Sequence, residues 1–141
     1  MRQKLTLVTL GVRDLEKSLK FYRDGLGWVP SSASHGDIVF FDLGGIALSL
    51  YPRNLLAEDA TVSPEGTGFS GITLTHNSKS IEEVDSVLNQ AEKAGAQIIK
   101  KARKVFWGGY SGYFSDPDGY LWEVAWSPLI ELDEKDALIL P

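Results

Sequence analysis

Short stretches in which apolar and polar residues alternate mark the expected strands. Such a stretch opens each half of the chain, at residues 8–12 (VTLGV) and 72–76 (ITLTH). A period of two is typical of a strand with one buried face. Apolar residues at helical spacing follow each stretch, namely Leu15, Leu19 and Tyr22 in the first half and Ile81, Val84, Leu88 and Ala91 in the second. We therefore expect a strand and then an amphipathic helix in each half.

Both expected helices carry start and stop signals. Asp14 stands where an N-cap is needed before the first helix, and Ser80 with Glu83 three residues later is a capping-box pattern before the second. Glycines follow the last apolar residue of each helix, at Gly25 and Gly27 in the first half and at Gly95 in the second.

The segments after the helices repeat one another. Residues 39–50 read VFFDLGGIALSL and residues 113–124 read YFSDPDGYLWEV. Without a gap, Asp42 meets Asp116 and Ser49 meets Glu123, and each segment reads as strand, tight turn, strand. We therefore divide the single domain 1–141 into two modules, 1–52 and 69–128. A linker, 53–68, is expected to be a loop, and a tail, 129–141, has no counterpart.

Composition narrows the possible functions. The 141 residues carry a net charge of −5, 43% are hydrophobic and none is cysteine, so disulfides and thiolate sites are excluded. No apolar stretch approaches the roughly 18 residues of a membrane span. The basic residues at 100–104 (KKARK) are interpreted as a solvated loop, so no nucleic-acid partner is expected. These features favour a cytoplasmic protein with no membrane partner.

The repeat, with SGYFSDPDGYLWEVAW at 111–126 and DLEKSLKFY at 14–22, resembles the vicinal oxygen chelate superfamily. That superfamily includes glyoxalases, bleomycin-resistance proteins and extradiol dioxygenases. The resemblance implies an α+β fold in which two tandem βαβββ modules form a cup-shaped β-sheet cleft, and it implies a homodimer. Residues 107–113 and 133–141 are similar to a bacterial, glyoxalase-like subgroup for which no substrate is implied.

The resemblance also implies a divalent metal held by residues on the first and last strands of each module. Its four ligand positions fall on Leu7, Ser49, Gly71 and Glu123, and only Glu123 is a good ligand. The two histidines do not supply the missing metal ligands, because His76 is expected on the opposite face from Gly71 and His35 lies in a Ser-rich loop. We therefore expect no metal and no other cofactor.

Alternation predicts what the cleft contains once Glu123 is taken to face it. The expected ligand-binding residues are Thr9, Phe41, Ser49, Tyr51, Thr73, Trp107, Tyr110, Tyr113 and Glu123. Trp122 is expected in the core. The glycine-rich segment 107–110 is either a mobile loop that lays a ring over a ligand or a β-bulge packed on the sheet.

Three functions remain open. The first is a metal-free protein that binds a small aromatic or amphipathic molecule in the cleft, similar to the bleomycin-resistance branch. The second is a lyase, isomerase or dioxygenase-like enzyme that uses Glu123 as a catalytic base or as a residual metal ligand. The third is a dimeric interaction module, to which the apolar run at residues 138–140 would contribute.

Overall fold

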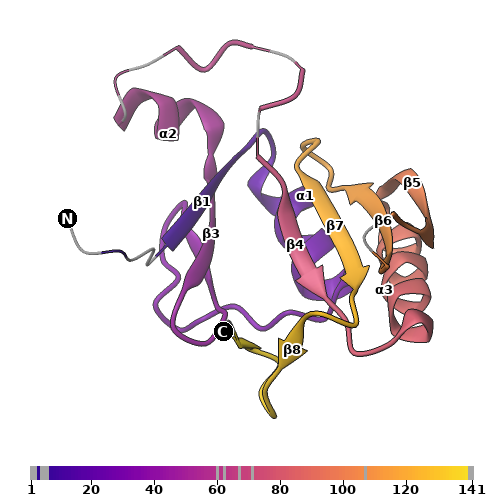
Figure 1. Cartoon of the computed structure of the whole chain (residues 1–141). Coiled ribbons are helices and arrows are strands. Elements are labelled where there is room, and N and C mark those ends of the chain that lie inside the picture. Colours follow the sequence, from indigo (N-terminus) through magenta and orange to yellow (C-terminus); the bar gives the residue numbers. More distant parts are fainter. Residues whose placement is uncertain are drawn as a thin grey trace. The chain divides into compact units, whose positions relative to one another are not determined.

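A computed structural model describes residues 3, 7–59, 61, 63–66, 68–70, 72–106 and 108–139 (Figure 1). The chain divides into two compact units, Met1–Phe69 and Ser70–Pro141, and each unit is described by itself. Within the described ranges, no helix has the length and the apolar character that crossing a bilayer requires.

The first unit contains a three-stranded sheet of order β1-β3-β2. β1 (Leu7–Val12) pairs in parallel with β3 (Ala47–Pro52), and β2 (Val39–Asp42) pairs antiparallel with β3. Between β1 and β2, α1 (Leu15–Leu19) continues into a π-helical segment, η1 (Lys20–Gly25). Residues 28–38 then run without a regular strand.

Aromatic packing fixes the core of the first unit on the side of its sheet that faces α1 and η1. The ring of Tyr22, which has no exposed surface, lies 6.0 Å from that of Phe41 and 5.3 Å from that of Trp28. Leu48 and Leu50 of β3 are buried with them. Burying a large apolar side chain contributes about 1.5–3 kcal/mol, so this cluster anchors the helix to the sheet.

The expectation of a loop over 53–68 is wrong for its first part, because α2 (Arg53–Asp59) is a helix. Ala57 is 7% exposed, and Leu56 approaches the backbone at Gly11 of β1. Burial of these apolar side chains on the sheet stabilises a short helix that could not be predicted from caps or periodicity in the local sequence. Within residues 53–68, the loop-forming residues Pro64, Gly66 and Gly68 come only after this helix.

The second unit has the expected βαβββ order. It consists of β4 (Leu74–Asn77), α3 (Ile81–Lys93), β5 (Gln97–Lys104), β6 (Tyr110–Ser115) and β7 (Leu121–Trp126), which form a sheet of order β4-β7-β6-β5. A separate short hairpin, β8 (Glu131–Leu132) and β9 (Leu138–Ile139), follows. The basic run at 100–104 therefore lies in strand β5, which corrects its interpretation as a loop.

Hydrogen bonds confirm the predicted caps and turn. The Asp14 carboxylate accepts from the Lys17 amide at 2.9 Å, and the Ser80 hydroxyl accepts from the Glu83 amide at 3.2 Å. At the β6–β7 turn, Oδ1 of Asp116 accepts from the amides of Asp118 and Tyr120, each at 2.9 Å. The two sheets and few helices confirm the α+β class.

Candidate functional site

The register of the second sheet brings four polar residues into one row. Thr75 of β4 lies opposite Glu123 of β7, Glu123 lies opposite Tyr113 of β6, and Tyr113 lies opposite Lys100 of β5. Directly paired residues point to the same face of a sheet. We call Thr75, Glu123, Tyr113 and Lys100 the polar row.

The polar row lies on the face turned away from α3, here called the open face of this sheet. The neighbouring residues Phe114, Trp122 and Val124 alternate onto the other face and are at most 7% exposed. Gly112 marks that other face as well, since a Cβ built on it would lie 2.7 Å from Leu88 of α3. The burial of Trp122 confirms its predicted place in the core.

Contacts within the polar row join its members. The Thr75 hydroxyl donates to Oε2 of Glu123 at 3.5 Å, and Nζ of Lys100 lies 5.6 Å from the centre of the Tyr113 ring, within the range of a cation–π contact. Burial raises the pKa of Tyr113, and the charge of Glu123 and a hydrogen bond to it raise that pKa further. The Tyr113 phenol therefore stays protonated at neutral pH and can donate to the carboxylate.

The first sheet has an equivalent row with different chemistry. Thr9 lies opposite Ser49, and Ser49 lies opposite Phe40. The Ser49 hydroxyl, which has no exposed surface, donates to Oγ1 of Thr9 at 2.8 Å. This row holds no charge, and its two hydroxyl groups bind one another.

The predicted place of Phe41 on the ligand-facing side is wrong by one residue. In the β2–β3 hairpin, the last paired residues are Asp42 and Ala47, and four residues lie between them. In the β6–β7 hairpin, the last paired residues are Ser115 and Leu121, and five residues lie between them. An alignment of the repeat without a gap therefore shifts β2 by one position. Phe41, 1% exposed, lies on the helix side, and Phe40 is the counterpart of Tyr113.

Tyr110 does not lie over a ligand on the open face, as the mobile-loop interpretation of residues 107–110 predicted. It alternates with Ser111 and Tyr113 along β6, and its hydroxyl donates to Oδ1 of Asp85 on α3 at 2.9 Å. That hydrogen bond is the main cause of a raised pKa for Tyr110. The ring is thus tied to α3 and is not a free lid.

The remaining predicted residues are scattered. Tyr51 is half-buried at the end of β3, and Thr73 is exposed just before β4. Trp107 lies outside the described residues, so its predicted role stays a prediction. His35 and His76 are both exposed.

The residues at the implied metal positions do not fit a metal. Leu7 offers no donor atom, Ser49 is fully buried with its hydroxyl bonded to Thr9, and Gly71 lies outside the described residues. Glu123 supplies one carboxylate, whereas a catalytic metal generally needs about three protein ligands. Nowhere in the part of the chain that the structure describes do three His, Asp or Glu side chains gather to hold an ion.

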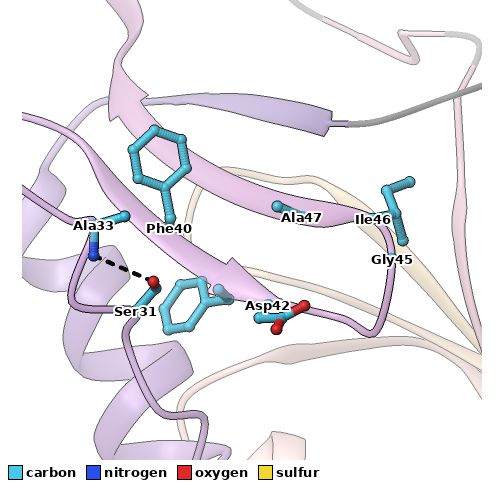
Figure 2. Close-up of a pocket in the computed structure, with 8 residues that line it drawn as sticks. Ser31, Ala33, Phe40, Asp42, Gly45, Ile46 and Ala47 are labelled. Atoms are coloured by element: carbon cyan, nitrogen blue, oxygen red, sulfur yellow. Dashed lines mark hydrogen bonds between the residues drawn. The ribbon is translucent and has the colours of Figure 1, made fainter.

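A hollow of about 380 Å³ opens in the first unit beside the β2–β3 turn. Figure 2 shows Ser31 and Ala33 at one end of it and Gly45 and Ile46 at the other. Its lining is mainly apolar, and Asp42 is the charged member. It is lined by Ser31, Ala33, Phe40, Phe41, Asp42, Gly45, Ile46 and Ala47.

Sequence reasoning missed Lys100 and Phe40 as members of the rows. A run of lysines and arginines is typical of a solvated segment, and nothing in the run itself shows that a tyrosine ring lies under one of its ammonium groups. Phe40 was missed because the turn lengths of the two halves differ, a difference that became visible only with the strand register.

Comparisons with known proteins agree on one family. Residues 4–124 match the family model of the Glyoxalase/Bleomycin resistance protein/Dioxygenase superfamily. The crystal structure of a glyoxalase-related enzyme from Fulvimarina pelagi is similar with a TM-score of 0.88 and 32% identity, covering 98% of each chain. The YraH protein of Bacillus subtilis (strain 168) is 30% identical over 86% of this chain and 96% of its own. The metallothiol transferase FosB of Shouchella clausii is 31% identical over 88% of this chain and 80% of its own.

Proposed function

Because the chain belongs to the glyoxalase/bleomycin resistance protein/dioxygenase superfamily, we propose that it binds a small aromatic or amphipathic molecule on the open face of its second sheet, without a metal ion. The observation that carries this proposal is the polar row. Glu123 and Tyr113 are both half-buried there, so their polar groups remain partly accessible beside the ring of Tyr113. A few placed polar groups next to an aromatic surface are typical of small-molecule sites.

Each member of the polar row has a distinct role in this proposal. The Glu123 carboxylate accepts hydrogen bonds from a donor or cationic group of the ligand. The Tyr113 ring supplies apolar contact area, and its neutral phenol holds the carboxylate in place. Thr75 orients the other side of that carboxylate at 3.5 Å.

Binding of matched naphthalene probes tests the proposal. Calorimetry would compare 1-naphthalenemethanol, 1-naphthylmethylammonium and 1-naphthylacetate, each with and without EDTA. We expect saturable binding of at least one probe, unchanged by EDTA. Binding of a probe with a hydrogen-bond donor, the alcohol or the ammonium, should be weakened about tenfold in Glu123→Gln, the loss typical of a charge-assisted hydrogen bond. Glu92→Gln, which removes an exposed carboxylate from α3, is the matched control.

Two outcomes would contradict the proposal. One is the failure of every probe to bind the folded protein. The other is near-stoichiometric metal, measured by elemental analysis of protein purified without chelators, that disappears in Glu123→Gln. The second outcome would restore a chelate site around a different ligand set.

An enzyme is the second candidate, and the hydrogen bond between Tyr113 and Glu123 favours it. A carboxylate hydrogen-bonded to a phenol places a proton acceptor beside a proton donor, the pairing that acid–base catalysis uses. Glu123 would then abstract a proton from the bound molecule. Turnover lost in Glu123→Gln while probe binding is kept would distinguish the enzyme from the binding protein.

The proposal includes a homodimer in the cytoplasm. Apolar side chains near the end of the second unit support the dimer, since Leu129 is 83% and Leu138 is 49% exposed. Analytical ultracentrifugation tests this part, and Leu129→Ser together with Leu138→Ser should shift the protein toward the monomer. A monomer in the unaltered protein would contradict the dimer.

A further inference from the structure

Strand β5 departs from regular pairing twice. It is the edge strand of the second sheet, beside β6 (Figure 1). Its register against β6 shifts between Ile98 and Lys100 and again between Lys100 and Arg103. Each shift inserts one extra residue, which is the definition of a β-bulge.

The bulges decide which side chains reach the open face. Regular alternation from Lys100 would give that face Ala102 and Lys104. The structure instead pairs Arg103 with Ser111, two residues from Tyr113 along β6 and therefore on the same face as Tyr113. Lys100 and Arg103 thus both lie on the open face.

The other two basic residues of β5 lie elsewhere. Lys104 pairs with Tyr110, whose hydroxyl bonds to α3. Lys101 lines a separate groove together with Asp85 and Glu92 of α3. The run KKARK is therefore divided between the two faces, with two cations on each.

Glycine at position 112 makes this arrangement possible. A Cβ there would lie 2.8 Å from the carbonyl oxygen of Lys100 and 2.9 Å from the amide nitrogen of Ala102. The bulged backbone approaches β6 so closely that no side chain fits between them. Bulges of this kind commonly re-aim side chains next to binding sites.

The charges of Lys100 and Arg103 are not neutralised by a carboxylate of the described residues, since neither side chain forms an ion pair with one. Their partners on β6 are two residues apart, which corresponds to about 7 Å along a strand. Glu123 is on β7, two strands away from β5, which corresponds to about 10 Å between the two backbones at the usual strand spacing.

We infer that Lys100 and Arg103 form an anion-binding site, and that the molecule bound on the open face carries a carboxylate or a phosphate group held by these two side chains. The inference rests on the proposed function and adds the charge of the ligand to it. The ligand is then polarised, with its anionic end at β5 and a hydrogen-bond donor directed to Glu123. Arginine in particular binds both oxyanions through two parallel hydrogen bonds.

Four naphthalene probes of similar size test the inference by calorimetry: 1-naphthylacetate, 1-naphthyl phosphate, 1-naphthalenemethanol and 1-naphthylmethylammonium. We expect at least one anionic probe to bind about tenfold tighter than the neutral one. Lys100→Met and Arg103→Met should each weaken the affinity for that anionic probe about tenfold. Lys101→Met and Lys104→Met, which remove the same charge from the same strand, should leave it unchanged. The better of the two anionic probes identifies the oxyanion.

The outcomes separate this inference from the proposed function. If the neutral or cationic probe binds and the anionic probes have no advantage, the anion site is wrong and the proposed function stands. If Lys101→Met costs as much affinity as Lys100→Met, the effect is one of net charge and the site is also wrong. If no probe binds, both fail.

Discussion

Thr9, Ser49 and Phe40 occupy the same places in the first sheet as Thr75, Glu123 and Tyr113 in the second. In the first sheet these positions hold two hydroxyl groups that bind one another and a phenyl ring. In the second they hold a carboxylate, a phenol and a hydroxyl that remain partly accessible. The same strand pairing thus positions an uncharged row of side chains in the first unit and a charged row in the second.

The strands outside these rows differ as well. Among the described residues of the first unit, no regular strand lies beyond β2. Isolated contacts take its place there, such as the hydrogen bond from the Ser31 amide to the carbonyl of Phe40 at 2.8 Å and the bridge between Pro30 and Phe41. In the second unit, the bulged β5 adds Lys100 and Arg103 to the open face. The charged and polar side chains are thus concentrated in the second unit, whereas the first unit has an apolar hollow.

The largest expected effect tests the register of the first unit. Phe41→Ala should lower the free energy of unfolding by about 3–5 kcal/mol, since it leaves a cavity where the ring packs against Tyr22 and Trp28. Phe40→Ala removes a half-buried ring from the opposite face and should cost clearly less. Urea denaturation measures both, and equal losses would show that the face assignment is wrong.

Replacement of a tightly packed glycine in each unit should have the next largest effect. Gly112→Ala should lower the free energy of unfolding by about 1–3 kcal/mol, because three atoms lie within 2.9 Å of the added methyl group. Gly11→Ala in the first unit meets its nearest atoms at 3.2 and 3.3 Å and should cost less. A larger loss at Gly11 in thermal or urea unfolding would contradict the close approach of β5 to β6.

A smaller effect is expected from the hydroxyl groups. Ser49→Ala should cost about 1 kcal/mol, because it removes the donor to Thr9 in a fully buried position. Thr75→Ala, which breaks a longer contact at an exposed residue, should change stability less. If Ser49→Ala and Thr75→Ala shift the urea midpoint of unfolding equally, the hydroxyl groups of the first sheet are not more deeply buried than that of Thr75.

The smallest effect concerns the titration of two tyrosines. Both Tyr113 and Tyr110 should ionise above 10.0, the ordinary pKa of tyrosine. Glu123→Gln should lower the pKa of Tyr113 alone. Asp85→Asn should lower the pKa of Tyr110 alone. Because the folded-state pKa is raised, the linked stabilisation is present below pH 10 and is lost as the pH rises through the folded value. Ultraviolet absorbance of the phenolate during a pH titration measures this, and a fall in both pKa values in either variant would contradict the assignment.

Much of the fold could be predicted locally. The caps at Asp14 and Ser80 and the turn at Asp116 depend on side chains and amides a few residues apart, and all were confirmed. Alternation also placed Glu123 and Tyr113 on one face, and the register pairs them directly. The helix α2 could not be predicted in this way, because its stability depends on burying Ala57 and on the approach of Leu56 to β1.

The duplication and the α+β class could be inferred from the sequence alone, because they depend on periodicity and on the order of the strand and helix patterns. Which side chains share a face of a sheet depends on strand pairing and became known from the three-dimensional structure. A difference of one residue between two turns moved Phe41 into the core, and two bulges brought Lys100 and Arg103 together on the open face. A strand alternates with a period of two, so a single inserted residue reverses every later side chain, and the position of that insertion is set by the pairing with a distant strand.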